Sequence, residues 1–321
     1  MSNIPYLRIL KDSFVLTWKN RYLWWFGFFL SLSGLGSYNY TREDKDKADI
    51  QAALLNHPQA MKIILVGAAL FFVAFVIIII ASIISRGALI DSIEKHTRGE
   101  ISDFKSAWKK GRGFFWKVLL IDVFSGLFAI VAAIILFPPV AFLFWNHNYI
   151  IGVLMAIIAA IIFIPLIILI AYIKIFGYLY SILGNLKAWA AIENAYLIFK
   201  KNILSSLIMS VLIILANIIV FFILLFAIIP LLIIFLPLAL IFFLLLGKIG
   251  AITIGCFGFF ILLAILVFLR SLLGVFSQSV WVLFFHEIAQ QPEPETVTET
   301  ASETEPVIDS IPSATINSEQ E

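Results

Sequence analysis

The chain has 321 residues, of which 62% are hydrophobic and only 13% are charged, and its mean hydropathy is +1.05. A soluble domain is about half apolar and about a quarter charged, so the composition excludes an ordinary soluble protein and predicts a polytopic membrane protein. The net charge of +2 combines eight acidic and no basic residues in 289–321 with 22 basic and 12 acidic residues in 1–288.

The first predicted element is an amphipathic helix over residues 5–19, where Tyr6, Leu10, Phe14 and Trp18 recur at every fourth position. With basic residues off this stripe, the helix is expected to lie in the membrane interface or to lead directly into the first span. That span, about Tyr22–Leu35, is short for a crossing, which takes about 20 residues. A polar loop, Ser37–Ala60, follows it.

The next three spans are long apolar runs separated by polar segments. We predict them at about Lys62–Ile84, Phe115–Phe137 and Ile150–Ile173, with Pro138 and Pro139 ending the third span of the chain.

The stretch Ile203–Leu246 contains no charged residue and is too long for one crossing. We interpret Ile203–Ile229 as the fifth span and Pro230–Leu246 as a segment that dips into the membrane, because Pro230 and Pro237 interrupt the run. Two full spans are the alternative interpretation. The sixth span is predicted at about Ile252–Leu269, and the transmembrane domain at 1–288.

The final residues, 289–321, are rich in Glu, Thr, Ser and Pro. Such a segment buries too little apolar area to offset the entropy of ordering it. We therefore predict a disordered acidic tail, and a cytoplasmic protein is a candidate partner for it.

One short phrase occurs three times, each time at the start of a long apolar run. The copies are Ser13–Arg21, Asp103–Arg112 and Asn194–Asn202, and each places an aromatic residue directly before basic residues. Aromatic rings favour the membrane interface, and Lys and Arg reach anionic phosphates. The phrases predict an all-α transmembrane bundle of about six spans, built as three helical hairpin repeats with interfacial amphipathic helices. The predicted interfacial anchors are Trp18, Lys19, Arg21, Trp108, Lys109, Lys110, Phe199, Lys200 and Lys201.

Charge bias in the loops predicts the orientation of the chain. The segments before the first, third and fifth spans hold most of the basic residues. Placing these segments in the cytoplasm puts both termini there in a six-span protein of the cell membrane. The basic residues are spread over separate loops, which argues for membrane lipids and against nucleic acid as the partner. An oligomer is compatible with the sequence.

Two polar residues within predicted spans are candidate functional residues. Asp122 lies near the cytoplasmic end of its span, where Lys174 or Arg270 could pair with it, as a headgroup or solute site or as a structural ion pair. Asn217 lies near mid-membrane, where an amide can bond a neighbouring helix.

No pattern of catalytic or cofactor-binding residues is present in the sequence. The four histidines lack metal-ligand spacing, and neither a phosphate-binding loop nor a nucleophile elbow occurs. We therefore expect a protein that is not an enzyme and needs no cofactor.

The order of several short motifs resembles a broad group of uncharacterised bacterial six-span membrane proteins, which includes the membrane domain beside some glycerophosphodiester phosphodiesterases. The motifs are Ala88–Asp91, Arg98–Glu100, Phe104–Trp116, Ala190–Asn202 and Phe276–Glu287. The hydrolase domain of those enzymes is missing. The resemblance therefore implies an integral inner-membrane protein, and it transfers no catalytic residue.

Two functions from different classes fit these observations. The first is a non-enzymatic scaffold or lipid-interacting module. The second is a permease or flippase for a small amphiphile or lipid, since carriers are often built from repeats with broken helices.

Overall fold

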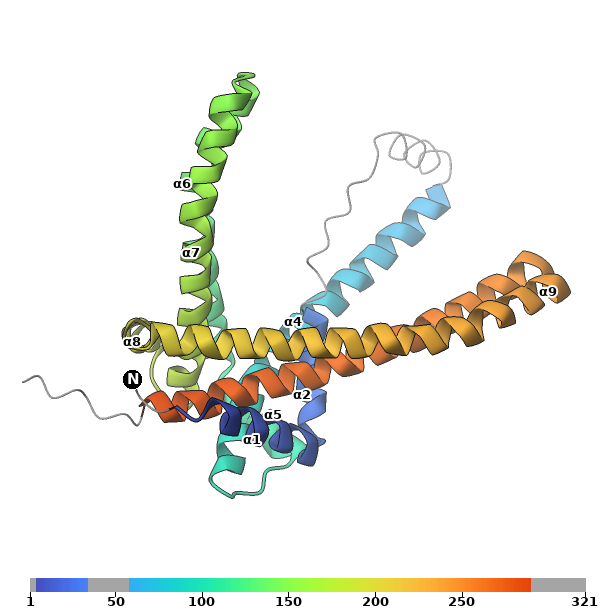
Figure 1. Cartoon of the computed structure of the whole chain (residues 1–321). Helices are drawn as coiled ribbons and strands as arrows, with labels where there is room; N and C mark the ends of the chain where they lie inside the picture. The colour runs from blue at the N-terminus through green and yellow to red at the C-terminus, as the bar shows by residue number, and fades with distance from the viewer. Residues whose placement is uncertain (1–3, 34–57, 290–321) are drawn as a thin grey trace, which may run out of the picture. The chain divides into compact units, whose positions relative to one another are not determined.

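The structure is a computed structural model that describes residues 4–33 and 58–289. Every regular element within these ranges is an α-helix, as the all-α prediction requires. Figure 1 labels them. The helices are α1 (Tyr6–Lys19), α2 (Leu23–Ser33), α4 (Pro58–Thr97), α5 (Phe104–Gly113), α6 (Phe115–Trp145), α7 (Tyr149–Ile182), α8 (Ala188–Lys201) and α9 (Ile203–Ala289).

The three copies of the aromatic-basic phrase become three copies of one structural unit. In each unit a short helix precedes two apolar helices: α1 before α2 and α4, α5 before α6 and α7, and α8 before the two arms of α9. Helix α2 is the one short member of these pairs. Each short helix carries basic residues in its last turn, where positive charge is favourable for the helix dipole. The prediction of three related hairpins with amphipathic helices is confirmed.

Five helical segments within the described ranges are long and apolar enough to cross a membrane. They are Met61–Thr97, Phe115–Trp145, Tyr149–Ile182, Ile203–Gly250 and Ile252–Ala289. The chain is thus an integral membrane protein. Helix α2 has 11 residues and is about 16 Å long, about half of the roughly 30 Å hydrocarbon core. The end of the predicted first span, the loop that follows and the acidic tail lie outside the described residues.

The prolines do not end the helices that contain them, which corrects two predictions. Helix α6 continues through Pro138 and Pro139 to Trp145, and the first arm of α9 continues through Pro230 and Pro237. A break in hydrocarbon would expose unpaired backbone groups with no water to satisfy them, so the remaining helical hydrogen bonds outweigh the one that each proline removes.

Helix α9 is a hairpin that reverses at Gly247, whose φ of 64° lies in the left-handed region that favours glycine. The two arms lie side by side (Figure 1), and the rings of Phe235 and Phe257 are 6.2 Å apart across them. The first arm, 203–246, is about 65 Å long, more than the roughly 40–45 Å of a whole bilayer. This arm is therefore one continuous helix, which corrects both interpretations of the stretch: a span with a separate dipping segment, and two full spans. A helix of this length fits a bilayer only when its axis is inclined to the membrane normal.

The buried core lies at the ends of the long helices that adjoin the short ones. On α4 the buried residues cluster between Ala81 and Glu94, whereas most of the preceding residues from Met61 are exposed. Helix α7 is buried mainly between Tyr172 and Ile182, and the second arm of α9 mainly beyond Ser271. The remaining parts of these helices present apolar side chains outward, as lipid-facing segments do.

Helix α2 joins this core through a close contact with the second arm of α9. A Cβ atom on Gly27 would lie 2.3 Å from the carbonyl oxygen of Ser271 and 2.9 Å from Cγ2 of Val275. Ser271 donates its hydroxyl hydrogen bond to the carbonyl of Trp24. Small residues let membrane helices approach closely, so that dispersion contacts and hydrogen bonds form between them.

Replacing Gly27 with Leu should therefore separate α2 from α9 and lower the thermal stability of the purified protein. Overpacking typically costs about 1–3 kcal/mol, and this contact involves backbone, which yields least. The control is Gly67→Leu, because a Cβ on Gly67 meets nothing within 4 Å. Equal melting temperatures of the two variants in the same detergent would contradict the α2–α9 contact.

Candidate functional site

The Asp122 cluster joins three of the long helices near their buried ends. We give this name to Asp122 of α6, Arg86 of α4, and Lys174 and Tyr178 of α7. Lys174 Nζ lies 2.5 Å from Asp122 Oδ1, and Arg86 Nη1 lies 3.4 Å from the same oxygen. Tyr178 donates a hydrogen bond to Asp122. One carboxylate thus accepts from two cations and a phenol.

Arg86 is held by more than its charge. Its Nη1 donates to the hydroxyl oxygen of Tyr178 over 2.5 Å, and its guanidinium carbon lies 4.8 Å from the centre of the Tyr178 ring. The side chains of Arg86 and Asp122 are 24% and 23% exposed. Water screens such a pair less than a surface pair, so the cluster ties α4 to α6 and α7.

The structure pairs Asp122 with Lys174, one of its two predicted partners, and not with Arg270. Neither Arg86 nor Tyr178 was predicted as a site residue. Arg86 begins the polar segment with helical character that separates two predicted spans, and a charge that directly follows an apolar run on a continuing helix was the available signal. Tyr178 gave no comparable signal, because tyrosine is common at membrane interfaces.

A second polar cluster connects α4 to the end of α9. The buried carboxylate of Glu94 lies 2.6 Å from Nη2 of Arg98 and also contacts His286. Nearby, His96 Nε2 and the hydroxyl oxygen of Tyr22 are 2.8 Å apart. The residues that the structure describes contain no group of three or more His, Cys, Asp or Glu side chains that could hold a metal ion.

Two predicted site residues lie away from the Asp122 cluster. Asn217 is exposed and donates to the carbonyl of Ile213 in its own helix over 2.8 Å. This corrects the expectation of a bond to a neighbouring helix. Arg270 is exposed on the second arm of α9, directly before Ser271.

The predicted anchors differ among the three phrases. Trp18 is 56% exposed, whereas Trp108 is partly buried with its ring centroid 6.2 Å from that of Phe26. Phe199 is buried, and its ring stacks on that of Tyr172 with 4.6 Å between the centroids. This ring therefore packs inside the protein, whereas the prediction placed it at the membrane interface. The basic anchors are all exposed: Lys19, Arg21, Lys109, Lys110, Lys200 and Lys201.

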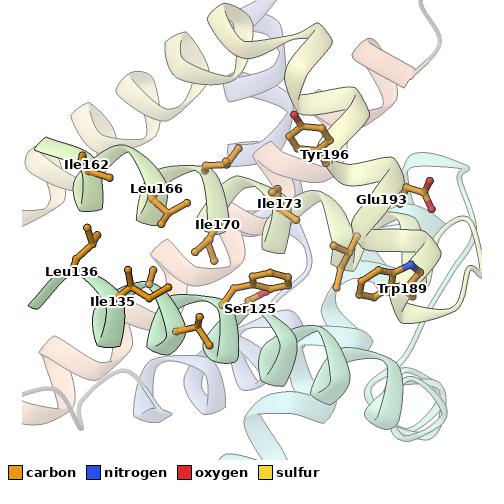
Figure 2. Close-up of a pocket in the computed structure, with 15 residues that line it drawn as sticks. Ser125, Ile135, Leu136, Ile162, Leu166, Ile170, Ile173, Trp189, Glu193 and Tyr196 are labelled. Carbon is orange, nitrogen blue, oxygen red and sulfur yellow. The ribbon is translucent and has the colours of Figure 1, made fainter. Parts of the chain in front are cut away.

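An apolar groove of about 820 Å³ lies between α6, α7 and α8, and we call it the α6–α7–α8 groove. It is lined by α6 between Ser125 and Leu136, by α7 between Ile162 and Ile173, and by four residues of α8. Figure 2 shows the aliphatic side chains of α6 and α7 across the groove, with Trp189 and Glu193 of α8 at one end.

The α6–α7–α8 groove has the depth of one membrane leaflet. Ser125 and Leu136 are eleven residues apart, as are Ile162 and Ile173, and eleven residues of helix rise about 16 Å, half of a roughly 30 Å core. Asp122 precedes Ser125 by three residues, and Lys174 follows Ile170 by four. Residues at these spacings share a helix face, so the Asp122 cluster adjoins the same end of the groove as α8.

Comparison with family models, with curated proteins and with solved structures finds no match to this chain. The resemblance to six-span bacterial membrane proteins therefore stays a prediction, and the candidate site depends on the geometry of this chain alone.

Replacing Asp122 with Asn should destabilise the protein, because it leaves Arg86 and Lys174 facing each other without the carboxylate. We expect a loss of about 2 kcal/mol, between the values for exposed and fully buried pairs, seen as a lower melting temperature. The control is Asp12→Asn, since Asp12 pairs with Arg8 at the surface. If both variants melt like the wild type, the cluster does not tie these helices together.

Proposed function

We propose that this protein is a non-enzymatic, lipid-interacting membrane module that holds a phospholipid acyl chain in the α6–α7–α8 groove. The observation that carries this proposal is the one-leaflet depth of an apolar groove whose polar groups gather at one end. A phospholipid has the same distribution, with apolar chains that fill one leaflet and a polar headgroup at its surface.

The size and lining of the groove support a bound chain. Its volume of about 820 Å³ falls in the range of about 300–1,000 Å³ that small-molecule sites occupy. The lining is aliphatic over most of its length, and its neighbour within a bilayer is lipid. The occupant that we propose is therefore an acyl chain of the surrounding membrane.

Retention of one particular lipid needs more than an apolar groove. Moving a chain from the bilayer into a protein groove transfers it between two apolar environments, so there is little hydrophobic driving force. Dispersion contacts along the groove and polar contacts at its α8 end supply the difference. Glu193 is exposed there and suits a headgroup ammonium, while Lys174, although paired with Asp122, places positive charge near the phosphate.

Filling the groove should release the bound lipid. We predict that Ala132→Trp, which adds an indole to the groove lining, lowers by at least half the amount of phospholipid that co-purifies per chain in mild detergent, measured by native mass spectrometry and lipid extraction. Ile135→Trp should act likewise from a more exposed lining position and guards against a folding defect in the first variant.

The matched control is Ala171→Trp, which makes the same substitution at an exposed position of α7 outside the groove. Wild-type protein that retains no phospholipid at a defined stoichiometry would contradict the proposed function. An equal loss of lipid from the Ala171→Trp control would do the same.

We also propose that the polar ends of the long helices, with the basic residues of α1, α5 and α8, face the cytoplasm of a bacterial cell. The support is the bias of basic residues toward these ends. From Asp122 to Trp145, α6 rises about 35 Å, enough to cross the roughly 30 Å core, so the α6–α7 turn would lie on the opposite side.

Cysteine labelling tests this orientation. Cys256 is the one cysteine of the chain, so Cys256→Ser gives a background without thiols. In intact cells a membrane-impermeant maleimide should label Asn148→Cys, in the α6–α7 turn. It should label Lys110→Cys, at the end of α5, only after permeabilisation. The reverse pattern would overturn the proposed orientation.

A further inference from the structure

A second apolar groove, of about 710 Å³, lies between α2 and the second arm of α9, and we call it the α2–α9 groove. Trp24, Trp25, Phe28 and Leu32 line it on α2, and residues between Phe260 and Ser271 line it on α9. It shares no lining residue with the α6–α7–α8 groove.

The α2–α9 groove also has the depth of one leaflet. Phe260 and Ser271 are eleven residues apart, a rise of about 16 Å, and α2 itself is about as long. Two contacts place Trp24 beside the same part of α9: Ser271 bonds to the carbonyl of Trp24, and the rings of Trp24 and Phe268 are 5.4 Å apart. The beginning of α2 therefore lies beside Ser271.

Positive charge gathers at this end of the groove. Arg21 lines it, and Arg270 comes directly before Ser271 on the facing helix. Arg270 follows Val267, a lining residue, by three positions, so it lies close to the groove face of its helix. Both arginines are exposed, and within residues 4–33 and 58–289 neither takes part in an ion pair.

These arginines differ from the cations beside the first groove. Arg86 and Lys174 share the carboxylate of Asp122, and Glu193 adds a negative charge to that groove. Within the part of the chain that the structure describes, no acidic residue lines the α2–α9 groove. Guanidinium groups bind phosphate oxygens in a bidentate geometry, so the two unpaired arginines suit a headgroup whose net charge is negative.

We propose that the α2–α9 groove is a second lipid site that selects an acidic phospholipid, with one acyl chain between α2 and α9 and the headgroup phosphate bound by Arg21 and Arg270. This site goes beyond the proposed function, because it adds headgroup selectivity and does not depend on occupancy of the first groove.

The test compares binding of phosphatidylglycerol and phosphatidylcholine to the full-length protein by native mass spectrometry in mild detergent. Wild-type protein should bind phosphatidylglycerol with the higher affinity. A charge-assisted hydrogen bond to a phosphate is worth roughly tenfold in affinity, so the double variant Arg21→Gln/Arg270→Gln should reduce this preference by roughly tenfold or more. The matched control, Lys109→Gln/Lys110→Gln, removes two exposed cations of α5 and should retain the preference.

Variants that fill each groove separate this proposal from the first one. Ala264→Trp adds bulk to the α2–α9 groove and should abolish the phosphatidylglycerol preference while leaving one bound phospholipid. Ala132→Trp, in the α6–α7–α8 groove, should retain the preference for phosphatidylglycerol and lose the phospholipid that is bound in that groove. Equal affinity of the wild type for the two lipids would overturn the α2–α9 site, as would an unchanged preference in Ala264→Trp or an equal loss in the α5 control. None of these outcomes bears on the α6–α7–α8 groove.

Discussion

Hydrocarbon supplies no partner for a polar group, and this constraint explains most of the architecture of the protein. The long helices are continuous through five prolines, from Pro138 to Pro237. Most of their charged side chains lie at the ends that adjoin α1, α5 and α8, with Lys62 and Lys248 as exceptions. The buried core lies at those same ends, because there polar and apolar contacts can be combined, while the remaining lengths of the helices pack in pairs and present apolar side chains outward.

Helix α4 has a central position in the core because its polar side chains lie at these ends of the long helices. Its Arg86 joins α6 and α7 through Asp122 and Tyr178. Two turns further on, its buried Glu94 joins the end of α9 through His286. Gly111 of α5 approaches α4 so closely that a Cβ there would lie 2.5 Å from the carbonyl oxygen of Ile84. One helix thus contacts parts of all three repeated units.

The repeated units were predictable from the sequence because each depends on a local pattern. An aromatic residue before two basic ones, followed by a long apolar run, indicates a short interfacial helix and a span wherever it occurs. Asp122 was predictable for the same reason, since a lone carboxylate in an apolar run is costly. The partner Arg86 was not, because helix α4 extends past the residue at which its hydropathy falls.

Tertiary packing decided the features that the sequence did not predict. Phe199 belongs to an aromatic-basic phrase, yet Tyr172 of another helix covers its ring. The continuation of α9 through Pro230 depends on the surrounding lipid, which removes water as a competitor for the freed carbonyl. Neither groove was predicted, because each depends on how particular helices pack against one another, which apolar composition alone leaves undetermined.

The two grooves share a depth and differ in charge, and their positions among the repeated units explain both properties. Each lies beside a helix that starts from an aromatic-basic phrase, so each begins at the polar end of that helix and extends about 16 Å along it. The α6–α7–α8 groove lies where three helices meet, and the contacts between them engage its neighbouring cations in ion pairs. The α2–α9 groove lies where only two helices meet, through the small residues Gly27 and Ser271. Among the described residues no carboxylate pairs with Arg21 or Arg270, so both guanidinium groups can bind a ligand.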